Sequence, residues 1–208
     1  MSFKLGNTSI GELYVGSNKI AQAYLGSNLV YQASGPTPPG PVGDEVTIGT
    51  QTWKTQDLSG TDGGEDIYTP DNVRYYYTLQ AAQRMAPNGW HVPTSAEFDT
   101  LLNYIGTNAC QKLKATSGWL DKAESDGGET GNGTDEYGFH GAPVGTYLYS
   151  QYTINGVGEY VYYITTTTGR NMYWQNVIYT LLLDRSDDGA RVAQSTYGNY
   201  YAVRLIKD

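Results

Sequence analysis

The chain has 208 residues, of which only 16% are charged, while glycine and tyrosine are unusually frequent at 26 and 20 residues. Its formal net charge is −8, with 15 acidic and 6 basic residues between positions 44 and 140, so no basic stripe exists for binding nucleic acid. The single cysteine, Cys110, excludes an intrachain disulfide.

No apolar run approaches the length of a membrane span, and residues 1–6 do not resemble a signal peptide. We therefore expect no membrane insertion. A role outside the cell then needs another route of export, and assembly into a phage particle released by lysis is one such route. The length leaves room for one good-sized domain with a small appendage.

The first 32 residues repeat with a period of ten. Gly6, Gly16 and Gly26 fall in register, each followed by two small polar residues and flanked by apolar ones. This pattern predicts three short strand pairs joined by tight turns, in residues 1–32. Such pairs bury too little to be stable alone, so we expect them to stack on other subunits as an oligomerisation base, as in a homotrimer. An unstructured tag is the alternative, which does not explain the regular alternation.

Residues 33–43 contain four prolines within six positions, which favours extended polyproline II structure and predicts a semi-rigid linker. The main domain then covers residues 44–208. It begins with Val46–Trp53, whose pattern predicts a strand, a turn and a second strand. Residues 75–82 lead into a short helix that ends before Pro87.

Thr94 and Glu97 have the spacing of a capping box and predict the start of a helix. The apolar residues that follow form one helical face, and Gly106 is a suitable stop. A second short helix is predicted over residues 109–114, and beyond Trp119 the pattern is one of loops and strands. Helices embedded in a strand-rich domain predict an α+β fold.

Five segments, in the same order along the chain, resemble the Fibrobacter succinogenes major paralogous domain, a family with the C-type lectin fold. The segments are Thr47–Leu58, Asn88–Phe98, Lys112–Trp119, Asn132–Phe139 and Tyr201–Asp208. The family usually has Cys-Pro before its Gly-Trp-His motif, whereas this chain has Ala86-Pro87-Asn88 there. The resemblance implies a C-type-lectin-like domain over residues 44–208.

The same fold houses the variable proteins of diversity-generating retroelements, in which adenine-directed mutagenesis rewrites codons near the C-terminus. The segments 169–180, 183–189 and 191–202 are similar to such variable regions in their tyrosine and asparagine content. The repeats of residues 1–32 resemble segments of phage structural proteins from gut bacteria. The resemblance implies a hypervariable ligand-binding face on a phage or bacterial protein.

Eleven of the 20 tyrosines lie in residues 147–208. Tyrosine offers a large contact area at low entropic cost and is common in adaptable binding surfaces. The predicted ligand-binding residues are Asn171, Tyr173, Gln175, Asn176, Tyr179, Arg191, Gln194, Asn199, Tyr200 and Tyr201. Tyr200 and Tyr201 follow Gly198-Asn199 and are expected to be exposed. Tyr160, Tyr162 and Tyr163 are instead expected to pack on a sheet.

The remaining candidate residues favour structural roles. Trp53, Trp90 and Trp119 are interpreted as core anchors, and Trp174 is ambiguous between the core and the surface. The two histidines have no carboxylate or cysteine spacing typical of a metal site. The acidic stretch 121–136 lacks EF-hand spacing and the calcium-binding triplets of C-type lectins, and favours a solvated loop.

The leading hypothesis is a ligand- or receptor-binding protein without catalytic residues, metal or cofactor, carried on a phage tail (in the virion) or on a bacterial cell surface. Its partner would be a protein or a cell-surface receptor. A fixed carbohydrate-binding lectin or adhesin is the alternative, which calcium-dependent glycan binding would favour. An enzyme of the formylglycine-generating type is a distant third, because its copper and redox chemistry needs two cysteines.

Overall fold

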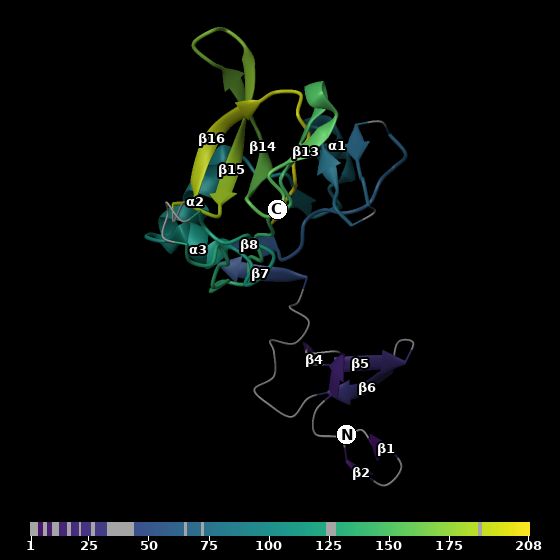
Figure 1. Cartoon of the computed structure of the whole chain (residues 1–208). Coiled ribbons are helices and arrows are strands. Elements are labelled where there is room, and N and C mark those ends of the chain that lie inside the picture. Colours follow the sequence, from purple (N-terminus) through teal and green to yellow (C-terminus); the bar gives the residue numbers. More distant parts are fainter. Residues whose placement is uncertain are drawn as a thin grey trace. The chain divides into compact units, whose positions relative to one another are not determined.

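The chain divides into two compact units, Met1–Val42 and Gly43–Asp208 (Figure 1). The computed structural model describes residues 44–208 except 65, 72, 124–127 and 187–188, together with the backbone of six short strands in the first unit. The predicted linker, 33–43, and the turns of the ten-residue repeat lie outside the described residues.

The described strands of the first unit form three antiparallel hairpins, β1–β2, β3–β4 and β5–β6, one in each ten-residue repeat. The strands are β1 (Lys4–Leu5), β2 (Thr8–Ser9), β3 (Leu13–Val15), β4 (Asn18–Ile20), β5 (Gln22–Leu25) and β6 (Asn28–Gln32). Each pair joins neighbouring segments of the chain, and its partners are set by local sequence.

The second unit is α+β, as predicted. Its helices are α1 (Leu79–Met85), α2 (Ser95–Ile105), α3 (Ala109–Leu113) and the 3-10 turn η2 (Tyr149–Gln151). Its strands are β7 (Glu45–Ile48), β8 (Gln51–Lys54), β9 (Ile67–Tyr68), β10 (Tyr76–Tyr77), β11 (Trp90–His91), β12 (Thr146–Leu148), β13 (Thr153–Asn155), β14 (Tyr160–Arg170), β15 (Asn176–Asp184), β16 (Arg191–Thr196) and β17 (Ile206–Lys207). Among the described residues, no helix is long and apolar enough to cross a membrane.

The predicted helix boundaries are confirmed where local signals define them. The Thr94 side chain accepts a hydrogen bond from the Glu97 amide, and the Glu97 carboxylate accepts one from the Thr94 amide at 2.7 Å, which completes the capping box of α2. Gly106 ends α2 with a positive φ of 71°. The shorter helices α1 and α3 also lie where the sequence predicts them.

A four-stranded antiparallel sheet, ordered β11-β17-β8-β7, joins the two ends of the unit. The predicted strand, turn and strand near residue 46 are confirmed as β7 and β8, with Gly49 at a φ of 63° in the turn between them. The C-terminal β17 inserts between β8 and β11, so the last residues of the chain are part of the framework.

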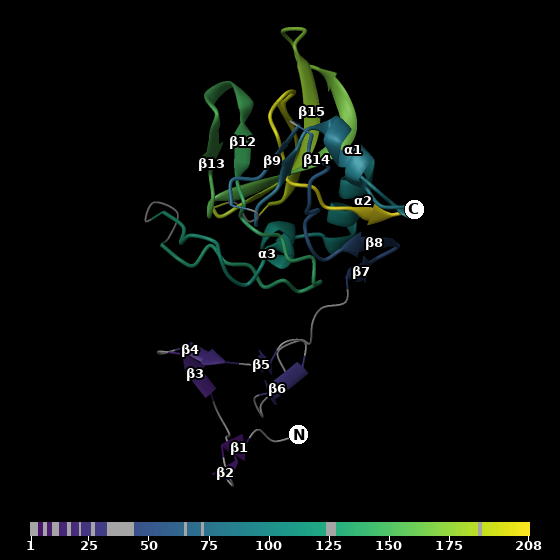
Figure 2. The ribbon, with the colours of Figure 1, turned by 90° about the vertical axis from the view of Figure 1, so that its right-hand side faces the viewer.

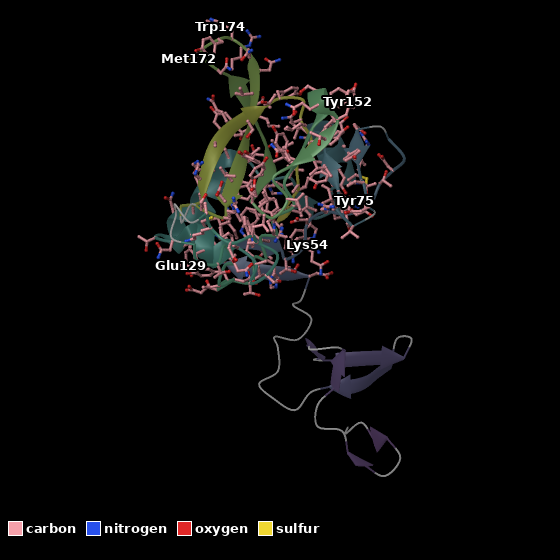
Figure 3. All side chains as sticks on the ribbon, viewed as in Figure 1. Lys54, Tyr75, Glu129, Tyr152, Met172 and Trp174 are labelled. Atoms are coloured by element: carbon pink, nitrogen blue, oxygen red, sulfur yellow. The ribbon has the colours of Figure 1, made fainter. Side chains whose placement is uncertain are left out.

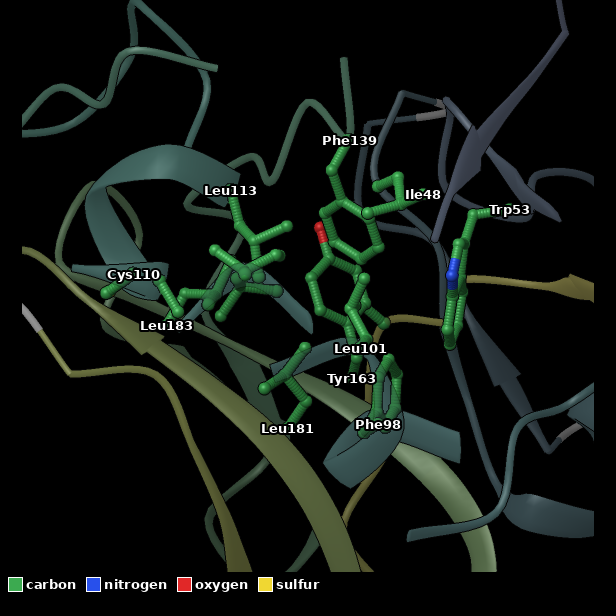
Figure 4. Packing of buried hydrophobic residues seen from close by; sticks show 14 of the residues in the cluster. Ile48, Trp53, Phe98, Leu101, Cys110, Leu113, Phe139, Tyr163, Leu181 and Leu183 are labelled. Atoms are coloured by element: carbon green, nitrogen blue, oxygen red, sulfur yellow. The ribbon is translucent and has the colours of Figure 1, made fainter. Parts of the chain in front are cut away.

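A second sheet, β14-β15-β16, has two faces with different partners (Figure 2). Successive strand residues point to opposite faces. One face carries Tyr163 and Leu181, which pack with Phe98 and Leu101 of α2 in the main core (Figure 4). The other face is only partly covered, by α1 and the C-terminal segment near Tyr201, in a second apolar cluster.

Tryptophans divide between core and surface. Trp53 and Trp119 are 0% and 5% exposed, which confirms them as core anchors, and Trp53 stacks on Phe98 with ring centroids 5.2 Å apart. Trp90 is half-buried beneath the ammonium groups of Lys54 and Lys207. Trp174 is 78% exposed, which resolves its ambiguity in favour of the surface.

Arg204 is a buried cation at the centre of the framework, with 1% of its surface exposed. Its guanidinium pairs with the Asp57 carboxylate and donates further hydrogen bonds to the Phe139 and His140 carbonyls and to the Tyr163 hydroxyl. Asp57 is therefore the counter-charge of this site.

Candidate ligand-binding groove

A groove of about 710 Å³ opens on the sheet face that points away from α2. It lies between the β14-β15-β16 sheet and the β12–β13 hairpin, which stand alongside each other in Figures 1 and 2. The lining residues are Thr146, Leu148, Tyr160, Tyr162, Asn171, Gln175, Asn176, Val177, Gln194, Ser195, Thr196, Tyr197, Asn199 and Tyr201. The volume is in the range of small-molecule sites.

A row of three tyrosine rings forms one side of the groove. Tyr160 and Tyr162 alternate with core residues along β14, and their rings meet edge to face at 5.2 Å. Tyr162 meets Tyr201 at 6.3 Å in the same way. The Tyr160 ring lies over Gly156, where an added Cβ would come within 2.1 Å of it, so the absence of a side chain there makes room for the ring.

The loop between β14 and β15 is tied together by Asn171. Its carboxamide oxygen accepts hydrogen bonds from the Tyr173 and Gln175 amides at 2.9 and 3.0 Å, and its carboxamide nitrogen donates to the Gln175 side chain at 2.9 Å. The Trp174 amide donates to the Asn171 carbonyl, and Trp174 has a φ of 61°. This network fixes a short turn whose side chains point outward.

Three large side chains project from that turn into solvent. Met172, Tyr173 and Trp174 are 82%, 74% and 78% exposed. Tyr149 and Tyr152, at the end of the β12–β13 hairpin, are 50% and 74% exposed. Figure 3 places Met172, Trp174 and Tyr152 at the same end of the unit. Two tips with exposed aromatic rings therefore border the groove.

The residues that line the groove carry no formal charge. Tyrosines, threonines, asparagines, glutamines, one serine and two aliphatic residues make up the lining. Burial raises the pKa of Tyr162, while nearby Arg191 and Asp184 act on it in opposite directions. The phenol groups of the row stay protonated at neutral pH and can donate as well as accept hydrogen bonds.

Six of the ten predicted binding residues line the groove: Asn171, Gln175, Asn176, Gln194, Asn199 and Tyr201. Tyr173 lies on the adjacent tip. Tyr179 does not line the groove: it is half-buried, it shares the face of β15 that carries Leu181, and its hydroxyl accepts a hydrogen bond from Gln194 at 3.1 Å. Arg191 is exposed at the start of β16.

The expected exposure of Tyr200 and Tyr201 is wrong. They are 8% and 2% exposed, because isolated β-bridges pair them with Tyr147 and Tyr77. Tyr149 also stacks on Tyr200, with ring centroids 5.6 Å apart and planes 6° apart. Both residues belong to the framework, although an edge of Tyr201 reaches the groove.

Sequence reasoning missed further groove and tip residues, which are Thr146, Leu148, Tyr149, Tyr152, Tyr160, Tyr162, Met172, Trp174, Val177, Ser195, Thr196 and Tyr197. The prediction that Tyr160, Tyr162 and Tyr163 pack on a sheet holds fully for Tyr163, which is 0% exposed. Tyr160 and Tyr162 are half-buried because they lie on the uncovered face of β14. Their alternation with buried residues was the available signal.

The histidines lie away from the groove and have carboxylate partners. His91 bridges Glu97 and Asp208, at 3.0 and 2.7 Å from its two ring nitrogens, and His140 pairs with Asp135. Partial burial lowers the pKa of His91, but the hydrogen bonds to Glu97 and Asp208 outweigh it and raise the pKa. Within the described residues, no three histidine, cysteine, aspartate or glutamate side chains gather as metal ligands.

A comparison with protein families gives a match over residues 21–207 to the family described as Fibrobacter succinogenes major domain. The matched range contains the groove, both tips and the strands β5 and β6 of the first unit. No curated protein and no solved structure matches the chain.

Proposed function

The chain belongs to the Fibrobacter succinogenes major domain family, and we propose that it is a ligand-binding protein whose groove and tips form the contact surface. The observation that carries the proposal is the arrangement of this surface. A rigid framework holds an uncharged groove of about 710 Å³ between two tips with exposed aromatic side chains.

The turn between β14 and β15 has a fixed backbone and exposed aromatic side chains, and this combination supports a role as a contact surface. Tyr173 and Trp174 cannot contribute much to the stability of the fold, since about three quarters of each side chain is in water. Yet Asn171 fixes the turn that presents them. A preorganised turn with aromatic side chains loses little entropy on binding and is typical of adaptable binding surfaces.

The finer proposal is a C-type lectin fold whose binding face is rewritten by a diversity-generating retroelement. Its support is that seven of the ten predicted binding residues, all within the segments that are similar to variable regions, lie on the groove or on its tip. Because Tyr200 and Tyr201 are buried, the proposal no longer includes them among the positions expected to vary. Positions that stabilise the framework tolerate few substitutions.

We further propose that the protein acts without catalysis, on a phage tail or a bacterial cell surface, and that the first unit brings several copies together. Multiple copies of a weak binding face raise the apparent affinity for a surface that carries many ligands. Light scattering of the full chain tests this last point, and a monomer would contradict it.

The experiment that tests the function measures binding of the fluorescently labelled full chain to bacterial cells from the community that carries the gene. Double replacement of Tyr173 and Trp174 by serine is expected to lower cell binding at least tenfold. The matched control is Tyr104→Ser, because Tyr104 is 59% exposed on α2, at the opposite face of the sheet. Equal binding by all three proteins would contradict the proposal.

The retroelement is tested separately by the DNA that follows the gene. We expect a near-copy of the last hundred or so bases beside a reverse transcriptase gene. If the genome lacks this near-copy, the retroelement proposal fails and the protein has a binding face of fixed sequence.

A further inference from the structure

The chemistry of the groove restricts what can bind in it. A charged ligand would lose its water without gaining a counter-charge, because no acidic or basic side chain lines the groove. Charged groups outside the lining do not supply one: Arg191 and Asp184 act on Tyr162 in opposite directions, and Glu159 and Asp184 act on Tyr160. An uncharged ligand avoids this cost.

The polar side chains that line the groove are all hydroxyls or carboxamides. Hydroxyl and carboxamide side chains both donate and accept hydrogen bonds, and they are best matched by a ligand whose own groups do both. Sugar hydroxyls have this property. Within the described part of the chain, the side chains of Tyr160, Tyr162 and Asn176 make no hydrogen bond to protein, so they are free to meet a ligand.

The aromatic row adds an apolar contact to this polar lining. The rings of Tyr160 and Tyr162 lie 5.2 Å apart on the same side of the groove, and the buried ring of Tyr201 packs against Tyr162 at 6.3 Å. Sugar rings combine apolar C–H faces with a rim of hydroxyl groups, so a short saccharide can place C–H faces on the row and hydroxyls on the amides. A ligand without such hydroxyls would cover the Asn176 carboxamide and the Tyr160 and Tyr162 hydroxyls without giving them a hydrogen-bond partner.

We propose that the groove binds a neutral oligosaccharide, directly through tyrosine rings, hydroxyls and amides and without calcium. This inference rests on the proposed ligand-binding function and names the ligand class for the groove. The described lining contains no carboxylate to hold a divalent cation beside a sugar. Binding is therefore insensitive to chelators and nearly independent of ionic strength.

The test is calorimetric titration of the full chain with neutral tri- and tetrasaccharides of glucose, galactose, mannose and N-acetylglucosamine. Oligosaccharides of uronic acids serve as the charged comparison, and each titration is repeated with EDTA. We expect at least one neutral saccharide to bind, at least tenfold more tightly than any acidic one and equally well with EDTA. Binding by none, stronger binding of an acidic saccharide, or loss in EDTA would overturn the inference.

Two variants place the binding in the groove. Asn176→Asp adds a charge at an exposed groove position and is expected to weaken neutral saccharide binding on the order of tenfold. Asn103→Asp, at an exposed position of α2, is the matched control and should change nothing. Tyr162→Phe keeps the ring and removes the hydroxyl, so it should weaken binding roughly two- to tenfold. Unchanged affinity in both groove variants would overturn the inference.

Cell binding separates this inference from the function on which it rests. If no neutral saccharide binds but cell binding is still lost in the tip variant, the saccharide is wrong and the binding function stands. If cell binding is unaffected by the tip and groove variants, the proposed function itself fails.

Discussion

Replacing Tyr201 with alanine tests the division between framework tyrosines and contact tyrosines. Tyr201 is 2% exposed, packs with Tyr77, Ile164 and Ile178, and donates a hydrogen bond of 2.7 Å to the Thr196 carbonyl. Tyr173 has the same side chain, lies 28 positions earlier and is 74% exposed. The two tyrosines therefore have opposite energetic roles in the same C-terminal segment.

The magnitude follows from burial. Truncation of a buried aromatic side chain to alanine costs about 3–5 kcal/mol of unfolding free energy. Tyr201→Phe keeps the ring, so it isolates the hydrogen bond and should cost about 0.5–1.5 kcal/mol. Tyr173→Ala should change the unfolding free energy by less than about 0.5 kcal/mol.

The assay is urea unfolding of the full chain, followed by aromatic circular dichroism, with thermal unfolding as a second measure. For a domain of this size, the loss in Tyr201→Ala corresponds to a decrease in Tm of roughly 6–20 °C. A loss below about 1 kcal/mol in Tyr201→Ala, or an equal loss in Tyr173→Ala, would refute the assignment of these residues.

Three further predictions concern the tip, a histidine and the buried cation. Asn171→Ala removes the side-chain hydrogen bonds of the turn between β14 and β15. We expect NMR to show increased backbone mobility in this turn, while the free energy of unfolding falls by less than about 1 kcal/mol. Unchanged mobility of the turn would contradict the role of Asn171. Partial burial lowers the pKa of His91, but its hydrogen bonds to Glu97 and Asp208 raise it above the ordinary 6.5. Protonated His91 therefore stabilises the folded state, and this contribution is lost as the pH rises through the raised pKa. The difference in unfolding free energy between wild type and His91→Gln should thus be largest at about pH 6 and shrink towards alkaline pH, and a constant difference in urea unfolding would count against this. Asp57→Asn leaves Arg204 buried without its counter-charge and should cost about 3–5 kcal/mol in the same assay, whereas a cost below about 1 kcal/mol would rule out the pairing.

Local features of the fold could be predicted from sequence because their signals lie within a few residues. Thr94 and Glu97 cap α2 through contacts three positions apart, and Gly106 ends it. The β7–β8 hairpin has its turn between two adjacent apolar segments. In each case the partner of a group is its near neighbour in the chain.

The burial of Tyr200 and Tyr201 could not be predicted in this way, because their partners are distant. Tyr77 precedes Tyr201 by 124 positions, and Tyr147 precedes Tyr200 by 53. The neighbouring Gly198-Asn199 indicates a turn but gives no information on what packs against the residues that follow. Local polarity was therefore misleading about exposure.

The candidate binding surface was predicted in part. Composition located it in the C-terminal segment, since tyrosine, asparagine and glutamine gather there. The opposite wall, with Thr146 and Leu148 of β12, comes from a hairpin whose placement depends on tertiary packing. The exposure of Trp174 depends on the turn that Asn171 closes, and tryptophan composition alone favours the core.

The most direct test of the central claim, that this face is a rewritten ligand-binding surface, is the pattern of variation in the gene across a natural population. Deep sequencing should show substitutions concentrated at Tyr173, Asn176, Tyr179 and Asn199, at codons with adenine in the near-copy. The buried Tyr201 and Trp53 should stay constant. Variation spread evenly along the gene, or confined to residues 44–140, would contradict the claim.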